Sequence, residues 1–135
     1  MAYAIMDIDG IGPLMAHKLK TLGIRTTEKL LETAKTAKGR KELAAKLGVD
    51  DKTVLRWANL ADRMRIKGVG EDYAELLQAA GVDTIKELKY RNVGKLAEAM
   101  KVANRRKPLV RVLPSEKRVK RWIEQARQLP PKISY

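Results

Sequence analysis

The sequence predicts an all-α protein built from two similar units. Residues 8–31 align with residues 66–89 at an offset of 58, and eight of these 24 positions are identical. Apolar side chains recur every three or four residues in both copies, the spacing of one face of a helix. The only stretch that alternates like a strand is Leu109–Leu113. Because repeated units bury their apolar faces against each other, we expect the two to pack as one compact body.

The repeat extends past this block and sets the expected domain boundaries. Lys52–Met64 matches Lys117–Leu129, and the tryptophans in these segments align at an offset of 65. The second copy therefore contains seven more residues (65 − 58), and the prolines of Asn104–Ser115 favour that stretch as the insertion. We expect a first repeat at 1–65 and a second repeat at 66–135, the latter with this basic insertion and a C-terminal helix.

Helix boundaries in the first repeat follow from single residues. Pro13 suits the first turn of a helix, where its missing N–H costs nothing. Gly23 suits the position just past the end of that helix, where a positive φ is needed. Thr26 and Asp50 are side chains of the type that cap helix N-termini, so we expect further helices to begin after them.

The second repeat carries the corresponding signals. Thr84 and Glu87 have the spacing of a capping box. In a capping box the Thr84 hydroxyl accepts from the backbone N–H of Glu87, and the Glu87 carboxylate accepts from the backbone N–H of Thr84. Ser115 can cap the last helix, which Pro130 and Pro131 are expected to stop.

Composition narrows the range of functions. The chain has 29 Lys and Arg against 16 Asp and Glu, a net charge of +13, which favours polyanionic partners such as nucleic acid. It has no cysteine and one histidine, so we expect no metal site and no cofactor. The first ten residues lack the features of a signal peptide, and no apolar run is long enough to span a bilayer. We therefore expect a soluble cytoplasmic protein with no membrane partner, and leave association with the nucleoid open.

Two glycine pairs, Gly10/Gly12 and Gly68/Gly70, each bracket one aliphatic residue before a predicted helix. One interpretation is a tight turn between helices. The other is a cradle for an anion, because the first amides of a helix lack internal partners and carry partial positive charge. A phosphate bound in this way would be held independently of base sequence.

These segments resemble a known motif. GIGPLMAHKL and GVGEDYAELL are similar to the helix-hairpin-helix motif of DNA repair and recombination proteins. The tandem arrangement, covering nearly the whole chain, resembles a family of small uncharacterised helix-hairpin-helix proteins, a domain of unknown function. The resemblance implies SAM-like helical units whose hairpin amides contact DNA phosphates. Some hairpins of this kind also hold a monovalent cation on their carbonyl groups.

The two copies differ in ways that matter for phosphate binding. Glu71, Asp72 and Glu75 follow the second glycine pair and would repel a phosphate. In the first copy Pro13 removes one donor and two aspartates precede the turn, but the bases that follow are favourable. We therefore expect the first hairpin, rather than the second, to contact phosphate.

Positive charge concentrates towards the C-terminus. Residues 1–65 carry a net +5 (13 − 8), residues 66–98 a net −1 (5 − 6), and residues 99–135 a net +9 (11 − 2). This last segment is the second expected contact region. The residues expected to contact nucleic acid are Gly10, Ile11, Gly12, His17, Lys18, Lys20, Gly68, Val69, Gly70, Arg105, Arg106, Lys107, Arg111, Lys117, Arg118 and Arg121.

The leading hypothesis is a non-catalytic protein that binds DNA or another nucleic acid without sequence preference. The alternative is a protein–protein interaction scaffold built on the same repeats, which the acidic second hairpin favours. An enzyme is a weaker third hypothesis: glycosylases with this motif use an aspartate beyond the hairpin, but Asp83 lies too close to Gly70 and is expected to be a helix cap.

Two further interpretations concern the segment Glu42–Trp57 and the two tryptophans. It has the pattern of a helix-turn-helix that would place Thr53, Leu55 and Arg56 in a major groove, although the repeat accounts for it without a recognition helix. Trp57 and Trp122 could stack on unpaired bases, but matched tryptophans in amphipathic helices favour a place in the core.

Overall fold

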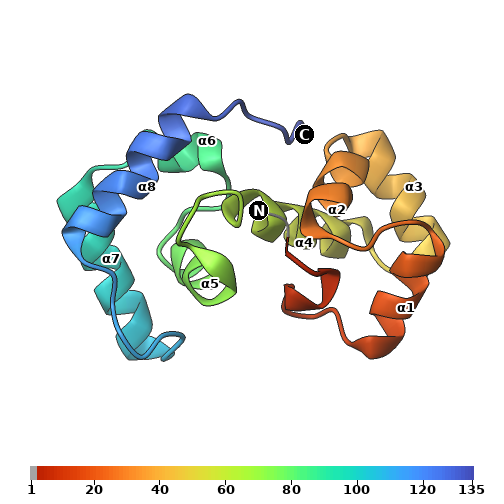
Figure 1. Cartoon of the computed structure of the whole chain (residues 1–135), viewed down its shortest axis with the longest axis horizontal. Coiled ribbons are helices and arrows are strands. Elements are labelled where there is room, and N and C mark those ends of the chain that lie inside the picture. Colours follow the sequence, from red (N-terminus) through yellow and green to blue (C-terminus); the bar gives the residue numbers. More distant parts are fainter. Residues whose placement is uncertain (1–2) are drawn as a thin grey trace. The chain divides into compact units, whose positions relative to one another are not determined.

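The structure, a computed structural model, describes residues 3–135 and confirms the all-helical prediction. Leu109–Leu113 forms no strand, and the β-type pairing found among the described residues is an isolated bridge between Ala4 and Thr26. In the described range a short 3₁₀-helix, η1 (Ile5–Asp7), precedes eight α-helices (Figure 1). These are α1 (Pro13–Thr21), α2 (Thr27–Ala34), α3 (Ala37–Leu47), α4 (Asp51–Arg63), α5 (Gly70–Ala79), α6 (Ile85–Leu88), α7 (Val93–Arg106) and α8 (Glu116–Gln128). None of the described helices is long and apolar enough to cross a membrane.

The chain divides into two units. The first consists of Met1–Arg65, described from residue 3, together with Lys132–Tyr135, and the second of Ile66–Pro131. Their packing against each other as one body stays a prediction.

The core of the first unit forms where α4 packs against α2 and α3. Leu30, Leu31, Val54 and Trp57 are at most 2% exposed, and they occupy the facing sides of α2 and α4. Burial of these large apolar side chains is the main stabilising contribution to this unit.

The second unit has the same order of helices. Its α7 packs against α5 and α8, and α8 also packs against α6, so α7 and α8 lie side by side (Figure 1). Leu77, Leu96, Met100, Trp122 and Ile123 form the centre of its core, each at most 2% exposed. Both tryptophans of the chain are therefore core residues, as their matched positions indicated.

Helix caps confirm most of the boundary predictions. The hydroxyl of Thr26 accepts from the Lys29 amide at 3.1 Å, and Asp50 accepts from the Lys52 amide at 3.0 Å. Ser115 caps α8 through the Arg118 amide at 3.2 Å. Pro13 is the first residue of α1.

The capping box predicted at Thr84 is correct in only one half. Thr84 accepts from the Glu87 amide at 3.4 Å, as expected. The Glu87 carboxylate, however, accepts from the amide of Asp83 at 3.0 Å, one residue before the cap. Glu87 thus accepts from the backbone N–H of Asp83, whereas a full capping box would have it accept from that of Thr84.

The C-terminal segment, Lys132–Tyr135, lies with the first unit, whereas we expected it in the second repeat. The Ser134 amide donates to the Lys35 carbonyl at 2.8 Å, and the buried Arg40 guanidinium donates to the Ser134 carbonyl at 2.7 Å. Lys132 pairs with Glu32 at 3.5 Å. These are contacts between residues about a hundred positions apart, which local sequence patterns do not encode.

Candidate functional site

We keep the names first and second hairpin for the turns at Gly10–Gly12 and Gly68–Gly70 with the helices that follow them, α1 and α5. The first consists of a left-handed turn and a helix whose N-terminus has no side-chain cap. Gly10 has a φ of +92°, which favours glycine, and Gly12 is the extended N-cap of α1 at φ −85°. Gly12 has no side chain to cap the helix, and the first i to i−4 bond of α1 runs from Ala16 to the Gly12 carbonyl. The amides of Leu14 and Met15 therefore lack acceptors within the helix, and the first turn of α1 contains no acidic residue.

Ile11 and Val69, the middle residues of the two glycine pairs, face inwards. Their side chains are 4% and 2% exposed. Their amides are also used within the turns, since Ile11 donates to the Ile8 carbonyl at 3.1 Å and Val69 to the Ile66 carbonyl at 3.3 Å. Both residues support the turn, and neither offers a free amide donor to a ligand.

Three predicted contact residues of the first unit, His17, Lys18 and Lys20, lie on α1 and are exposed. Lys18 and Lys20 are in the last turn of the helix, where a cation complements the helix dipole. No residue of α1 is acidic, so nothing along this helix opposes an anion at its uncapped N-terminus.

Arg56 of α4 lies beside the first hairpin and is absent from the contact residues expected from the sequence. Its Nη2 atom lies 3.3 Å from the position that a Cβ on Gly10 would occupy, and Trp57 Nε1 lies 3.5 Å from the same point. Arg56 is exposed and forms no hydrogen bond or ion pair with any residue in the described range 3–135. The helix-turn-helix interpretation singled out this arginine, but as a groove-reading residue rather than as a neighbour of Gly10.

The second hairpin differs from the first in its second glycine. Gly68 has a φ of +87°, close to that of Gly10, but Gly70 has a φ of +63° and is the first residue of α5. Glu71 and Asp72 occupy the first turn of α5, where they complement the helix dipole and oppose an anion.

Arg118 is committed to the second hairpin. Its Nη2 atom donates to the Gly68 carbonyl at 3.2 Å. The guanidinium lies 5.1 Å from the ring centre of Tyr73 and 5.7 Å from that of Trp122, distances typical of cation–π contacts. This predicted contact residue therefore has internal partners that would compete with a ligand.

Eight further basic residues, in the second half of α7, in α8 and in the connection between these helices, form what we call the C-terminal basic surface. All are exposed, and none forms an ion pair within the part of the chain that the structure describes. They are Lys101, Arg105, Arg106, Lys107, Arg111, Lys117, Lys120 and Arg121.

The connection between α7 and α8, residues 107–115, is held in place by two side chains. Asn104 accepts from the amides of Leu109 and Val110 at 2.8 and 3.1 Å and donates to the Val110 carbonyl at 3.1 Å. The Tyr73 hydroxyl of α5 donates to the Val112 carbonyl at 2.7 Å. Arg111 is thus presented by an ordered loop, although its neighbours have no regular secondary structure.

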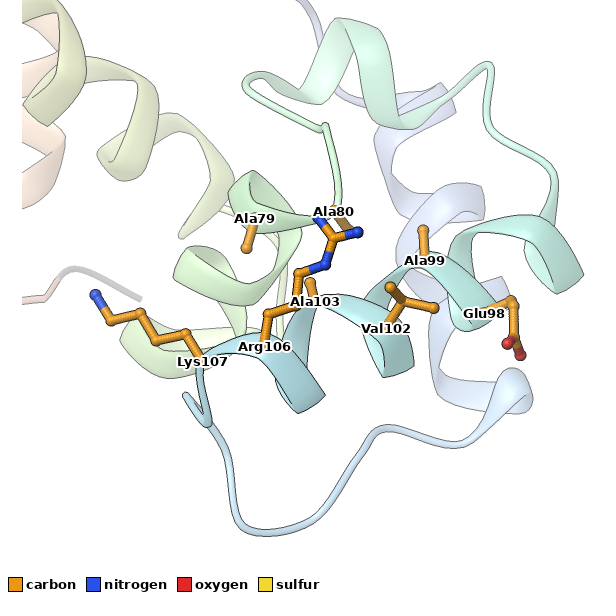
Figure 2. Close-up of a pocket in the computed structure, with 8 residues that line it drawn as sticks. All are labelled: Ala79, Ala80, Glu98, Ala99, Val102, Ala103, Arg106 and Lys107. Atoms are coloured by element: carbon orange, nitrogen blue, oxygen red, sulfur yellow. The ribbon is translucent and has the colours of Figure 1, made fainter.

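An open groove of about 410 Å³ lies between the end of α5 and one side of α7 (Figure 2). Its apolar lining consists of small side chains, with Ala79 and Ala80 from α5 and its C-terminal end, and Ala99, Val102 and Ala103 from α7. Figure 2 shows the Arg106 side chain extending across the groove towards Ala80, with Lys107 at one end. The groove offers apolar contact bordered by two cations and one carboxylate, that of Glu98.

A family model for a domain of unknown function (DUF4332) matches residues 9–129. The chain belongs to the DUF4332 family. No curated protein and no solved structure matches it.

The DUF4332 match begins directly before Gly10 and ends directly after α8. It therefore includes both hairpins, the groove and the C-terminal basic surface, while the C-terminal segment Lys132–Tyr135 lies outside it. Within this DUF4332 domain, the predicted contact residues fall into separate groups. The first hairpin and α1 belong to the first unit, and the second hairpin and the C-terminal basic surface to the second.

Proposed function

We propose that this protein is a non-catalytic, sequence-independent nucleic-acid-binding protein, with DNA as the expected ligand and the cytoplasm as the expected location. In this proposal each unit is a helix-hairpin-helix repeat. The contacts are made by the first hairpin and by the C-terminal basic surface, both of which address phosphates rather than bases.

The observation that carries the proposal is the unpaired charge of the C-terminal basic surface. Its eight cations are exposed along α7, the ordered 107–115 connection and α8, and none has an internal counter-ion among residues 3–135. Unpaired cations on one unit repel each other, so a polyanion relieves this repulsion and releases its own condensed counterions on binding.

The caps of the α-helices support a role for the first hairpin. Six of the eight described α-helices have a side chain that accepts from a first-turn amide, whereas α1 and α5, which follow the glycine pairs, have none. In α5 two carboxylates occupy the first turn. The N-terminus of α1 has no such charge, so its free amides suit a phosphate oxygen better.

A binding experiment across a salt series tests the proposal. Fluorescence anisotropy with short duplex and single-stranded DNA should give similar affinities for unrelated sequences. With about four to six phosphate contacts, the slope of log affinity against log salt on duplex DNA would be about −4 to −5. Absence of binding to either form at low salt would refute the proposal.

A protein–protein scaffold is the second candidate function, favoured by the alanine-lined groove of the second unit. Val102 on its wall is 38% exposed, and Val112 and Leu113 of the adjoining loop are 70% and 38% exposed. A stoichiometric protein partner recovered after nuclease treatment, and lost on Ala103→Glu substitution in the groove, would favour this candidate over nucleic-acid binding.

A further inference from the structure

Two N–H donor side chains of α4 converge on the turn at Gly10. The Nη2 atom of Arg56 lies 3.3 Å, and the Nε1 atom of Trp57 3.5 Å, from the point where a Cβ on this residue would stand. Because residue 10 is a glycine with a φ of +92°, it has no side chain to keep these two groups away from the turn. Both donors therefore lie directly against the turn, in contact with the backbone of Gly10.

The indole N–H of Trp57 points to a missing acceptor. Trp57 is 2% exposed, and its Nε1 atom is buried without a hydrogen-bond partner among the described residues. Buried donors are nearly always paired, because the lost hydration is otherwise not compensated. An acceptor atom that arrives at Gly10 from outside would supply the bond that the folded chain does not.

The surrounding charges favour an anionic acceptor. Arg56 is exposed and free of internal partners within residues 3–135, and the unused amides of Leu14 and Met15 begin the next helix. Against them stands the exposed carboxylate of Asp9. The nearby Asp7 is engaged internally, since it accepts from the Ala4 amide at 3.2 Å.

We propose that the surface of the turn at Gly10 binds one phosphate oxygen of a nucleic-acid strand, with Arg56 supplying the charge and Trp57 an indole hydrogen bond. The proposal rests on the proposed function for the source of the phosphate. Arg56 has a long flexible side chain, so its guanidinium can turn outwards to the phosphate and admit an oxygen to the indole N–H.

The second unit lacks the free arginine that this site requires. Beside Gly68, Trp122 Nε1 lies 3.6 Å and Arg118 Nη2 4.0 Å from the corresponding Cβ position. There the guanidinium already donates to the Gly68 carbonyl and forms cation–π contacts with two aromatic rings. One hairpin of each chain therefore binds phosphate, and the other does not.

The two tryptophans provide the readout. The chain has two indole N–H groups, so a ¹H–¹⁵N spectrum contains two indole signals, assignable through a Trp57→Phe variant. We expect a short oligothymidylate to shift the Trp57 signal and to leave that of Trp122 nearly unchanged. A parallel titration uses inorganic phosphate alone, and anisotropy follows oligonucleotide binding on the same samples.

Arg56→Gln should weaken oligonucleotide binding several-fold and reduce the salt slope by about 0.7, the value for one phosphate on a single strand. Lys38→Gln, which removes the same charge from an exposed position on α3, should have a smaller effect. Asp9→Asn should strengthen binding, because it removes an opposing carboxylate next to Gly10.

Each outcome separates the two proposals. Oligonucleotide binding with an unmoved Trp57 signal, or with equal effects of Arg56→Gln and Lys38→Gln, would overturn the phosphate site and leave the proposed function standing. A Trp57 shift with inorganic phosphate, but no oligonucleotide binding, would support the site and refute the proposed function. No response to either ligand would overturn both.

Discussion

The Tyr73 hydroxyl donates a 2.7 Å hydrogen bond to the Val112 carbonyl, and this bond ties α5 to the basic connection between α7 and α8. The Tyr73 ring also packs 5.5 Å from the Trp122 ring, between their centres, and stacks with Arg118. The second hairpin therefore has a structural role, because the helix that follows it positions the loop that carries Arg111. This explains how the turn can persist beside carboxylates that disfavour a phosphate.

Tyr73→Phe should loosen this loop. The substitution keeps the ring and removes the hydroxyl, so we expect a loss of about 1 kcal/mol of unfolding free energy. Hydrogen exchange at residues 109–113 should become faster, and DNA affinity should fall to a similar extent on all sequences. Tyr90→Phe is the control, because Tyr90 is 76% exposed; an equal effect of both variants would contradict the role of the Val112 bond.

The paired variant Arg105→Gln and Arg106→Gln should weaken DNA binding uniformly across sequences. Both side chains are exposed at the end of α7 without ion pairs in the described range. Loss of two phosphate contacts should reduce the salt slope on duplex DNA by about 1.8. The control is Lys38→Gln with Lys41→Gln on α3, which removes equal charge from the first unit. Matching losses in the two pairs would indicate a general effect of net charge.

The second glycines of the two hairpins should respond differently to alanine. Gly70 has a φ of +63°, so Gly70→Ala should destabilise the protein by about 1–2 kcal/mol. Gly12 has a φ of −85° and open space at its Cβ position, so Gly12→Ala should cost about 0.5 kcal/mol through its cap position. Chemical denaturation of both variants measures the difference, and equal losses would contradict the observed backbone geometry.

Asp50 should make stability depend on pH in the acid range. Its hydrogen bond from the Lys52 amide lowers its pKa below the ordinary value of 3.8. The cap therefore contributes its full stabilisation above the ordinary pKa and loses it as pH falls through the lowered pKa. Asp50→Asn keeps a capping oxygen that does not titrate, so its acid unfolding should be less steep. Thermal unfolding at a series of pH values tests this, and parallel curves for the two proteins would contradict it.

Much of the fold follows from signals only a few residues long. Pro13, Thr26, Asp50 and Ser115 define helix starts because the groups they satisfy lie within one turn of them. The repeat likewise anticipates the shared left-handed conformation of Gly10 and Gly68. These local interactions form within one helical turn, so they do not depend on how the helices pack against each other.

The candidate site was less predictable. Gly12 and Gly70 align in the repeat, yet their φ angles differ, and the sequence alone does not indicate this difference. The charge count identified the C-terminal basic surface, but it could not show that Arg118 is held by Gly68 while Arg56 is free beside Gly10. Those assignments depend on how α4 and α8 pack against turns far away in the chain.

By itself, the sequence determined an all-helical protein with an internal repeat, several of its helix starts and the location of its excess positive charge. Only the tertiary structure decided which arginine meets which hairpin, and that Lys132–Tyr135 returns to the first unit. The reason is physical. Periodicity, capping and backbone φ act over one or two turns, whereas the partners of a long side chain are set by packing between distant segments.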